Sequence, residues 1–546
     1  MSQVPASLGR HFEAPEGFTG QFGWLCGFSA DEGFLNEALE RFSYQQANQR
    51  AYAGQTLLAL MLDPRAVQID PIGVPGLLHL PWANGELPFN LMHAKVALLA
   101  FRSTDTSGAW CLRLLVSTGN WTRQTLEQSL DLVWCLDMHS DDLSSPSDAT
   151  RQVCADISSA WGLVDWLRTH YDRRALQANP LTTAAVAQLD ECLLKQVKPW
   201  AANLTPRFFH NRKKSLLDQL PAKVLHASGR GSARNYLAMG SGFYESSLAD
   251  DQSSVPLSIV QRLRGEEGEP RLLTASSCVD LFVNEASCQG IADSVPLLTA
   301  AGISVKPAVQ PAWFAEQPQR TLHAKFIFSA SEVGHSGKTA SPWLYLGSGN
   351  LTRQGFTQQM GRLKGNLEAG VVFAPESMNW YPAKPGVADP QAIGYRLPIQ
   401  WDQECAPQEP APGPGPRSGR RGIRRGPCGL SGLAGCRDAG ARLAERRRAC
   451  AAGLLAAGHV GAGVCLGRGA GLRLVRAATP AGAGRMAGRR GDPDCHGAGA
   501  RRIRPFGRHR LAGHQPGGRL AAARRIPTRP RRRRIAQCVR SLPGPA

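Results

Sequence analysis

The sequence has no pair of cysteines in CxxC spacing and no close cluster of cysteine with histidine, although it contains 14 cysteines. Zinc fingers and ribbons need such clusters, and disulfide-rich domains need dense cysteines, so neither class fits. Scattered cysteines in a chain of 546 residues are typical of buried thiols in a reducing compartment. The chain also begins without a basic segment followed by an apolar run, which argues against a signal peptide.

Strongly apolar runs of membrane-spanning length are missing as well. The long uncharged stretch Ala449–Gly467 is a mixture of glycine and alanine, which is too weakly apolar for a transmembrane helix. We therefore expect a soluble, cytoplasmic protein with no membrane partner. Its length allows two or three domains with hydrophobic cores of their own.

Acidic and basic residues are distributed very unevenly. Residues 406–546 contain 30 arginines, no lysine and 5 acidic residues, a net charge of +25. Residues 1–405 contain 33 basic and 38 acidic residues, a net charge of −5. The overall charge of +20 therefore comes from the tail, and the remainder of the chain offers little positive field for binding long nucleic acids.

Residues 404–546 are predicted to be a low-complexity basic tail, and two interpretations stay open. Tails rich in arginine and glycine can bind RNA or anionic surfaces. This one shows no RGG repeat and consists mainly of Arg, Gly, Ala and Pro, the residues that GC-rich DNA encodes when it is read out of frame. The composition favours a frameshifted C-terminus over a nucleic-acid-binding tail.

Strand and helix signals alternate through residues 20–120 and again after residue 234. Short apolar runs such as "FGWLCGFS", "TLLALMLD" and "CLRLLVSTGN" predict strands, and "DEGFLNEALERFS" predicts an amphipathic helix. Residues 150–220 read as mostly helical. This alternation predicts an α/β fold with sheets covered by helices.

A duplicated motif is the strongest organisational signal in the chain. "HAK" at His93 leads through an apolar run to "STGNWTRQ", and "HAK" at His323 leads through another to "GSGNLTRQ". His93 precedes Asn120 by 27 positions, and His323 precedes Asn350 by the same number. We infer two related α/β halves.

The residue types in these motifs suit a phosphate group. Histidine and lysine two positions apart lie on the same face of a strand, so both can reach one anion, and the asparagine adds an amide donor. Such donors stabilise the charge of a phosphoryl-transfer transition state. An imidazole with a pKa of about 6.5 can act as nucleophile, acid or base at neutral pH. Two sets around one phosphate would need neither a metal nor a cofactor.

These motifs closely resemble those of the phospholipase D superfamily, which carry HxK, a later aspartate and GSxN. Ala100 and Ala330 stand where that aspartate would fall. Loss of the aspartate in both halves, with histidine, lysine and asparagine kept, resembles the tyrosyl-DNA phosphodiesterase branch. The first motif departs from GSxN, because Ser117-Thr118 stands in place of Gly-Ser.

The resemblance covers about residues 20–403. It includes "NLEAGVVFAP" around Glu368, "RLPIQWD" at Arg396–Asp402 and "GSGFYESS" at Gly240–Ser247. It implies two pseudo-symmetric α-β-α sandwich halves, residues 1–220 and 221–403, that share one central active site.

The resemblance also implies roles for individual residues. His93 would attack phosphorus and form a phosphohistidine, and His323 would protonate the leaving group and later activate water. Glu368 would orient the imidazole of His93, and Asp131 is a loose match for the first-half residue that supports the other histidine. The residues that would bind the phosphate are Lys95, Lys325, Asn120, Asn350 and Ser348.

Other residues in the motifs have structural explanations that we prefer. Thr122 and Thr352 are expected to cap the helices that follow, although Arg353 could contact phosphate. Trp110, Trp121 and Trp343 are expected to pack in the core.

The resemblance implies a metal-independent phosphodiesterase that removes adducts such as phosphotyrosine from the 3′ ends of DNA, as a monomer acting on single-stranded ends. Two alternatives stay open. One is a broader nuclease or phospholipid hydrolase of the same superfamily. The other is a nucleic-acid-binding protein that uses its arginine-rich tail, which intact motifs in both halves argue against.

Overall fold

The computed structural model describes residues 6–399 apart from residues 230, 246–253, 267–268, 285–289, 312–313, 315–316, 333–336, 377 and 385–388. All the described residues belong to one compact unit of the chain. The predicted tail, residues 400–402 of "RLPIQWD" and residues 246–247 of "GSGFYESS" lie outside them. We keep the names first half and second half for residues 1–220 and 221–403.

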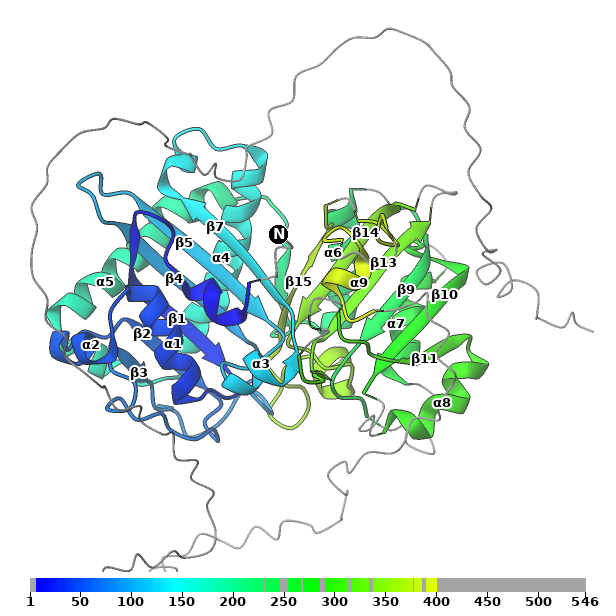
Figure 1. Ribbon diagram of the computed structural model, residues 1–546, viewed down its shortest axis with the longest axis horizontal. Helices are drawn as coiled ribbons and strands as arrows, with labels where there is room; N and C mark the ends of the chain where they lie inside the picture. Colours follow the sequence, from blue (N-terminus) through cyan, green and yellow to red (C-terminus); the bar gives the residue numbers. More distant parts are fainter. Residues whose placement is uncertain are drawn as a thin grey trace, which may run out of the picture. The chain divides into compact units, whose positions relative to one another are not determined.

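The first sheet has six strands in the order β3-β2-β1-β4-β5-β7 (Figure 1). Strands β1, β2 and β3 run parallel, and β4, β5 and β7 add to β1 in antiparallel fashion. The strands are β1 (Phe18–Gly27), β2 (Leu58–Leu62), β3 (Leu77–His79), β4 (Val96–Ser103), β5 (Trp110–Ser117) and β7 (Val133–His139).

The second sheet has seven strands in the order β11-β10-β9-β13-β14-β15-β8. Strands β9, β10 and β11 are parallel, and β13, β14, β15 and β8 follow in antiparallel fashion. The strands are β8 (Phe208–His210), β9 (Arg234–Gly240), β10 (Leu273–Val283), β11 (Ile303–Pro307), β13 (Phe326–Glu332), β14 (Thr339–Gly347) and β15 (Ala369–Phe373).

The two sheets repeat one topology. In each, three parallel strands are followed by three antiparallel ones in the same order, so that β4 corresponds to β13, β5 to β14 and β7 to β15. Strand β8 is an addition to the second sheet, and the predicted boundary at residue 220 falls within the helix that follows it, α6 (Leu216–Ser228). The prediction of two pseudo-symmetric α/β halves is confirmed.

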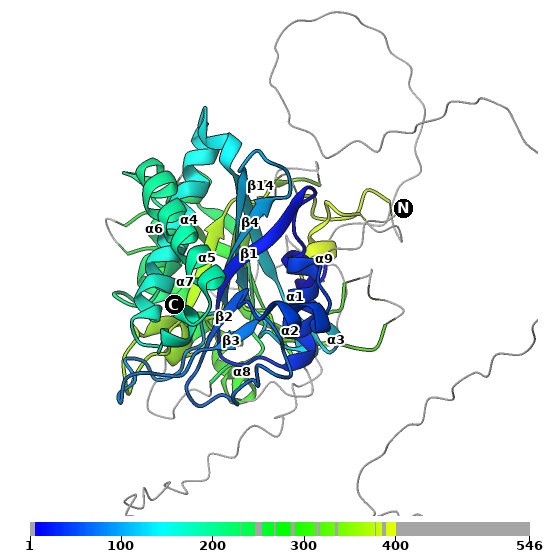
Figure 2. The same ribbon diagram turned by 90° about the vertical axis from the view of Figure 1, so that its left-hand side faces the viewer.

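Helices cover both faces of the first sheet (Figure 2). On one face, Leu25 and Leu58 pack with the apolar side of α1, and on the other, Trp24 and Met61 pack with α4. This division follows from the strand period, because neighbouring side chains point to opposite faces. In the first half, the helices among the described residues are α1 (Glu32–Ser43), α2 (Ala47–Ala53), α3 (Arg123–Glu127), α4 (Asp148–Arg168) and α5 (Pro180–Glu191). Helix α6 spans the boundary, and α7 (Val255–Arg264), α8 (Ile291–Ala300) and α9 (Ile393–Arg396) belong to the second half.

The two halves share a hydrophobic core. One continuous cluster of buried side chains contains Trp134 and Ile157 of the first half together with Leu346 and Val371 of the second. A short two-stranded parallel sheet also joins the halves, formed by β6 (Ser129–Leu130) and β12 (Thr321–Leu322). Both connections hold the two halves together.

Several local predictions are confirmed. The hydroxyls of Thr122 and Thr352 accept hydrogen bonds from the first turn of the helices that follow them. Trp121 and Trp343 are fully buried. Cys26, Cys111, Cys154 and Cys192 are buried.

No helix within the described ranges combines the length and apolarity that crossing a bilayer requires.

Candidate active site

Each His-x-Lys triplet immediately precedes the first antiparallel strand of its sheet, which pairs with β1 in the first half and with β9 in the second. His93 and Lys95 lead into β4, and the corresponding residues of the second half lead into β13. Because β4 pairs antiparallel with β5, the start of β4 lies beside the end of β5, where Asn120 follows. The structure therefore brings each predicted triplet next to the asparagine of its own half.

The imidazole of His93 is held by a carboxylate from the other half. Its Nδ1 lies 3.0 Å from Oε2 of Glu368, a residue that is fully buried just before β15. The same carboxylate accepts hydrogen bonds from the hydroxyl of Ser348 and, at Oε1, from the side-chain amide of Asn366 at 3.1 Å. These donors fix the carboxylate, so the Nε2 edge of His93 is the one left for chemistry.

His323 has the reciprocal arrangement. Its Nδ1 lies 2.9 Å from Oδ1 of Asp131, which belongs to the first half and lies just before β7. The hydroxyl of Thr118 donates to Oδ1 of Asp131 at 2.8 Å, and that of Ser129 donates to Oδ2 at 2.7 Å. Each half therefore contributes one imidazole and the carboxylate that orients the imidazole of the other half.

Thr118 is the residue that sequence reasoning missed. It precedes Asn120 by two positions, as Ser348 precedes Asn350, and both hydroxyls donate to an imidazole-orienting carboxylate. The departure of "STGN" from "GSGN" therefore keeps a hydroxyl at the equivalent position. This shared offset from asparagine is a signal that could have identified Thr118.

Ser348 contacts the carboxylate that orients His93. Its side chain is fully buried, and its hydroxyl donates to Glu368 and lies 3.3 Å from the carbonyl oxygen of Ala369. These contacts give Ser348 a part in positioning Glu368, and its contact with substrate stays a prediction.

Both lysines of the paired motifs are fully buried. Lys95 Nζ donates to the carbonyl oxygen of His93 at 2.8 Å, and Lys325 Nζ lies 3.2 Å from the carbonyl oxygen of Thr118 and 3.1 Å from Nε2 of His323. Burial and the neighbouring ammonium of Lys325 lower the pKa of Lys95 to about 7, and burial lowers the pKa of Lys325 to about 8. A bound anion would relieve the repulsion between the two cations.

The imidazoles are shifted towards the neutral form. Burial, with the nearby ammonium of Lys95, lowers the pKa of His93 to about 4 despite the opposing effect of Glu368. Burial and Lys325 also lower the pKa of His323, against the effect of Asp131. Burial alone would raise the carboxyl pKa values, but the adjacent imidazoles and lysines hold both Glu368 and Asp131 below their usual range, so both are ionised.

Asn120 and Asn350 are left with unused hydrogen-bonding capacity. The side-chain oxygen of each is buried and accepts no hydrogen bond from the part of the chain that the structure describes. An unsatisfied buried polar atom costs about 1–3 kcal/mol, so such atoms point to a role outside the fold itself. Both equivalent asparagines show it, and only their side-chain amide nitrogens could donate to an anion.

Within the described ranges, the donor atoms of Cys111, Asp137 and His139 lie close enough together to be considered as metal ligands. Asp137 is already paired with Arg113 through two hydrogen bonds of 2.6 Å. Burial raises the pKa of the Cys111 thiol, which keeps it protonated. The group lies at the opposite end of β5 from Asn120 and is poorly suited to hold a cation.

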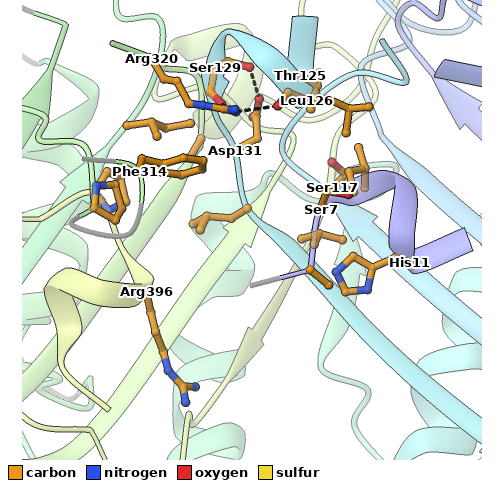
Figure 3. Close-up of a pocket in the computed structure, with 18 of the residues that line it drawn as sticks. Ser7, His11, Ser117, Thr125, Leu126, Ser129, Asp131, Phe314, Arg320 and Arg396 are labelled. Carbon is orange, nitrogen blue, oxygen red and sulfur yellow. Dashed lines mark hydrogen bonds between the residues drawn. The ribbon is translucent and has the colours of Figure 1, made fainter. Parts of the chain in front are cut away.

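A cavity of about 610 Å³ lies against Asp131 but contains neither imidazole (Figure 3). Arg320 lines it and donates to the carbonyl oxygens of Leu126 at 2.7 Å and Ser129 at 3.5 Å. Asp131 directs its Oδ1 to His323, so the cavity borders the site through this carboxylate, and Ser117 and Ala324 of the paired motifs also line it. The chemistry belongs to the paired motifs and not to this cavity.

The described fold and site define a duplicated α/β protein with a paired His-Lys-Asn centre. No family model and no curated protein matches the sequence. Yeast tyrosyl-DNA phosphodiesterase is similar in structure, with 10% identity and a TM-score of 0.40 over 68% of this chain and 88% of that one. A mutant form of the yeast enzyme gives 12% identity and a TM-score of 0.41 over the same shares. Polyphosphate kinase from Porphyromonas gingivalis gives 12% identity and a TM-score of 0.31, over 68% of this chain and 45% of that one.

Loss of either orienting hydroxyl is expected to impair turnover without unfolding the protein. Ser348→Ala removes a donor to Glu368, and Thr118→Val removes one to Asp131. A hydrogen bond to a charged group contributes about 1.5–3 kcal/mol, so kcat should fall by about 10- to 100-fold with a smaller change in KM. Ser329→Ala is the matched control, because Ser329 is also fully buried but donates to the carbonyl oxygen of Tyr236. Equal losses of kcat in Ser329→Ala and Ser348→Ala would contradict this positioning role.

Proposed function

We propose that this protein is a metal-independent phosphodiesterase that works through a covalent phosphohistidine and hydrolyses adducts such as phosphotyrosyl bonds at the 3′ ends of DNA. The observation that carries the proposal is the reciprocal exchange of carboxylates. Each imidazole donates Nδ1–H to a carboxylate from the other half, which turns its Nε2 away from that carboxylate, and Nε2 of His323 lies 3.1 Å from Lys325 Nζ. The resemblance of the motifs to the tyrosyl-DNA phosphodiesterase branch supports the choice of DNA adducts.

The first step forms the covalent intermediate. Nε2 of neutral His93 gives its electron pair to phosphorus while the bond from phosphorus to the leaving oxygen breaks. That oxygen takes the Nε2 proton of protonated His323, whose charge Asp131 stabilises. Lys95, Lys325, Asn120 and Asn350 bind the non-bridging oxygens and stabilise the transition state.

The second step releases the product. His323, now neutral, accepts a proton from a water molecule as the water oxygen attacks phosphorus. The bond from phosphorus to nitrogen breaks, and its electron pair returns to His93. The product is a phosphate monoester on the DNA end, and both imidazoles regain their starting protonation.

The test of the proposed function is turnover of a 3′-phosphotyrosyl oligonucleotide in EDTA, beside plain single-stranded DNA and phosphatidylcholine. We expect release of tyrosine and a 3′-phosphate, with slower or no cleavage of the other two. Faster cleavage of plain DNA or of the lipid would favour the broader nuclease or the lipid hydrolase. Cleavage of none of the three would overturn the enzyme proposal.

The pH dependence of kcat/KM is expected to have its maximum on the acid side of neutrality. His93 must be neutral to attack, and its pKa of about 4 sets the acid limb. His323 must be protonated to donate, so activity falls as the pH rises through its pKa, which burial holds below the usual 6.5. Deprotonation of Lys95, with a pKa of about 7, then adds a further loss. Initial rates at subsaturating substrate across pH 4–9 measure both limbs.

Asp131→Asn serves to assign the alkaline limb. Asp131 raises the pKa of His323, so its neutralisation should move that limb to lower pH and leave the acid limb in place. The exposed residue Asp105 provides the control substitution, Asp105→Asn. An optimum above pH 8 in the unaltered protein would contradict the assignment of His323 as the acid.

A further inference from the structure

Two phenylalanine rings lie beside the two imidazoles, one in each half. The ring of Phe28 is centred 5.8 Å from that of His93 at an interplanar angle of 59°. The ring of Phe243 is centred 6.1 Å from that of His323, edge to face at 89°. Phe28 follows β1 and Phe243 follows β9, which are the equivalent strands of the two sheets.

Each phenylalanine lies on a backbone segment that is tied to the residue after a phosphate-facing asparagine. In the first half, Trp121 N donates to the carbonyl oxygen of Ser29 at 3.2 Å, and Asp31 N donates to that of Trp121 at 3.1 Å. Trp121 directly follows Asn120. The position of Phe28 is therefore coupled to that of the first asparagine.

The second half repeats this arrangement with a different set of bonds. The hydroxyl of Ser241 donates to the carbonyl oxygen of Phe243 at 2.8 Å and accepts a hydrogen bond from Leu351 N at 3.2 Å. Leu351 directly follows Asn350, and it also forms a β-bridge with Tyr244. The duplication has kept the spatial relation between ring, imidazole and asparagine.

Gly242 brings the Phe243 segment against His323. A Cβ at this position would lie 2.9 Å from the carbonyl oxygen of Leu322 and 3.0 Å from Cα of His323, so only glycine permits this approach. The close passage places the ring of Phe243 at the edge of the imidazole that we propose as the acid.

Neither ring is needed for the hydrophobic cores. Phe28 and Phe243 are absent from the three clusters of buried side chains, and 42% of Phe243 is exposed. An apolar ring that is held in place, partly open and next to a phosphate-binding site offers a surface on which a flat group can stack.

We propose that Phe243 and Phe28 determine substrate specificity by stacking on planar groups on either side of the scissile phosphodiester. This inference rests on the proposed function. Phe243 contacts the leaving group, because it lies beside the imidazole that protonates that group. Phe28 contacts the group that stays on phosphorus, because that group becomes linked to His93. The substrate class is then a diester with a nucleoside on one side and an aromatic leaving group on the other, and not an alkyl diester such as a phospholipid.

The test crosses two variants with three synthetic diesters. The parent substrate is thymidine 3′-(phenyl phosphate). Thymidine 3′-(trifluoroethyl phosphate) lacks the aromatic leaving group, and methyl phenyl phosphate lacks the nucleoside. Phe243→Leu and Phe28→Leu keep an apolar side chain of similar volume but remove the ring.

We expect Phe243→Leu to lower kcat/KM about 5- to 100-fold for the two phenyl esters and less than about 3-fold for the trifluoroethyl ester. Phe28→Leu should lower it to a similar extent for the two thymidine esters and spare methyl phenyl phosphate. Phe243→Tyr, which keeps a ring, should retain the activity of the parent. Tyr52→Leu is the control, because Tyr52 is an exposed aromatic residue on α2, outside the site.

Equal losses on all three diesters would show that the rings only support the fold and would overturn the inference. Covalent trapping separates this failure from failure of the proposed function. If the His323→Asn protein forms a phosphohistidine with the parent diester but the crossed pattern is missing, the inference alone is wrong. If the unaltered protein cleaves none of the diesters and nothing is trapped, both are wrong.

Discussion

Substitution of His93 by alanine is expected to abolish covalent capture of the substrate and to lower kcat at least about 1,000-fold, as loss of a nucleophile does in other enzymes with covalent intermediates. The imidazole is the group that the structure prepares best for attack. Its Nδ1 is held by Glu368, and its pKa of about 4 keeps it neutral over the working range of pH. No other described residue combines this burial and orientation with a position next to Lys95.

The measurement is denaturing electrophoresis of the protein after incubation with a labelled 3′-phosphotyrosyl oligonucleotide, together with steady-state rates. His79→Ala is the matched control. Burial also lowers the pKa of His79 to about 4, but His79 lies in β3, and its Nδ1 accepts a hydrogen bond from Ile69 N at 3.0 Å. Retention of trapping in the His93→Ala protein would show that another residue is the nucleophile.

The second large effect is expected from His323→Asn, which should make the covalent adduct accumulate. A tyrosyl leaving group has a pKa of about 10, so the first step can proceed, more slowly, without a proton donor. Water has a pKa of about 15.7 and needs the base, so the second step should lose the full contribution of about 100- to 10,000-fold. The slower second step leaves the intermediate populated.

The adduct should survive denaturation and be released by acid, because a phosphoramidate bond is acid-labile. The double variant His93→Ala/His323→Asn is expected to form none. If the His323→Asn protein loses turnover and yields no adduct, then the first step depends on His323 more than the second step does, and the prediction that the adduct accumulates is wrong.

The parts of the fold that follow from local pattern could be predicted from the sequence. Short continuous apolar runs predicted β1, β2, β4 and β5, which are buried along most of their length, and the threonines after each asparagine predicted the helix starts. Strand β8 was hidden in a region that reads as helical. Three residues carry too little periodicity, and their pairing with β15 depends on tertiary contacts.

The site residues also differ in how far the sequence alone could locate them. The His-x-Lys and asparagine positions could be located because the spacing within each half is identical. The orienting residues could not be located with the same certainty, since Asp131 and His323 are 192 positions apart and Glu368 and His93 are 275 apart. The loops that lead to the two carboxylates also differ in length, which hides their equivalence from a simple alignment of the halves.

The exchange of carboxylates between the halves has a consequence for the synthesis of the chain. At about 5–20 residues per second, a ribosome adds Glu368 roughly 14 to 55 s after His93. During that interval the emerging first half contains a histidine whose orienting partner has not been made and a carboxylate, Asp131, whose imidazole has not been made. The site therefore stays incomplete until Glu368 and the last strand of the second sheet, β15, have been translated and docked.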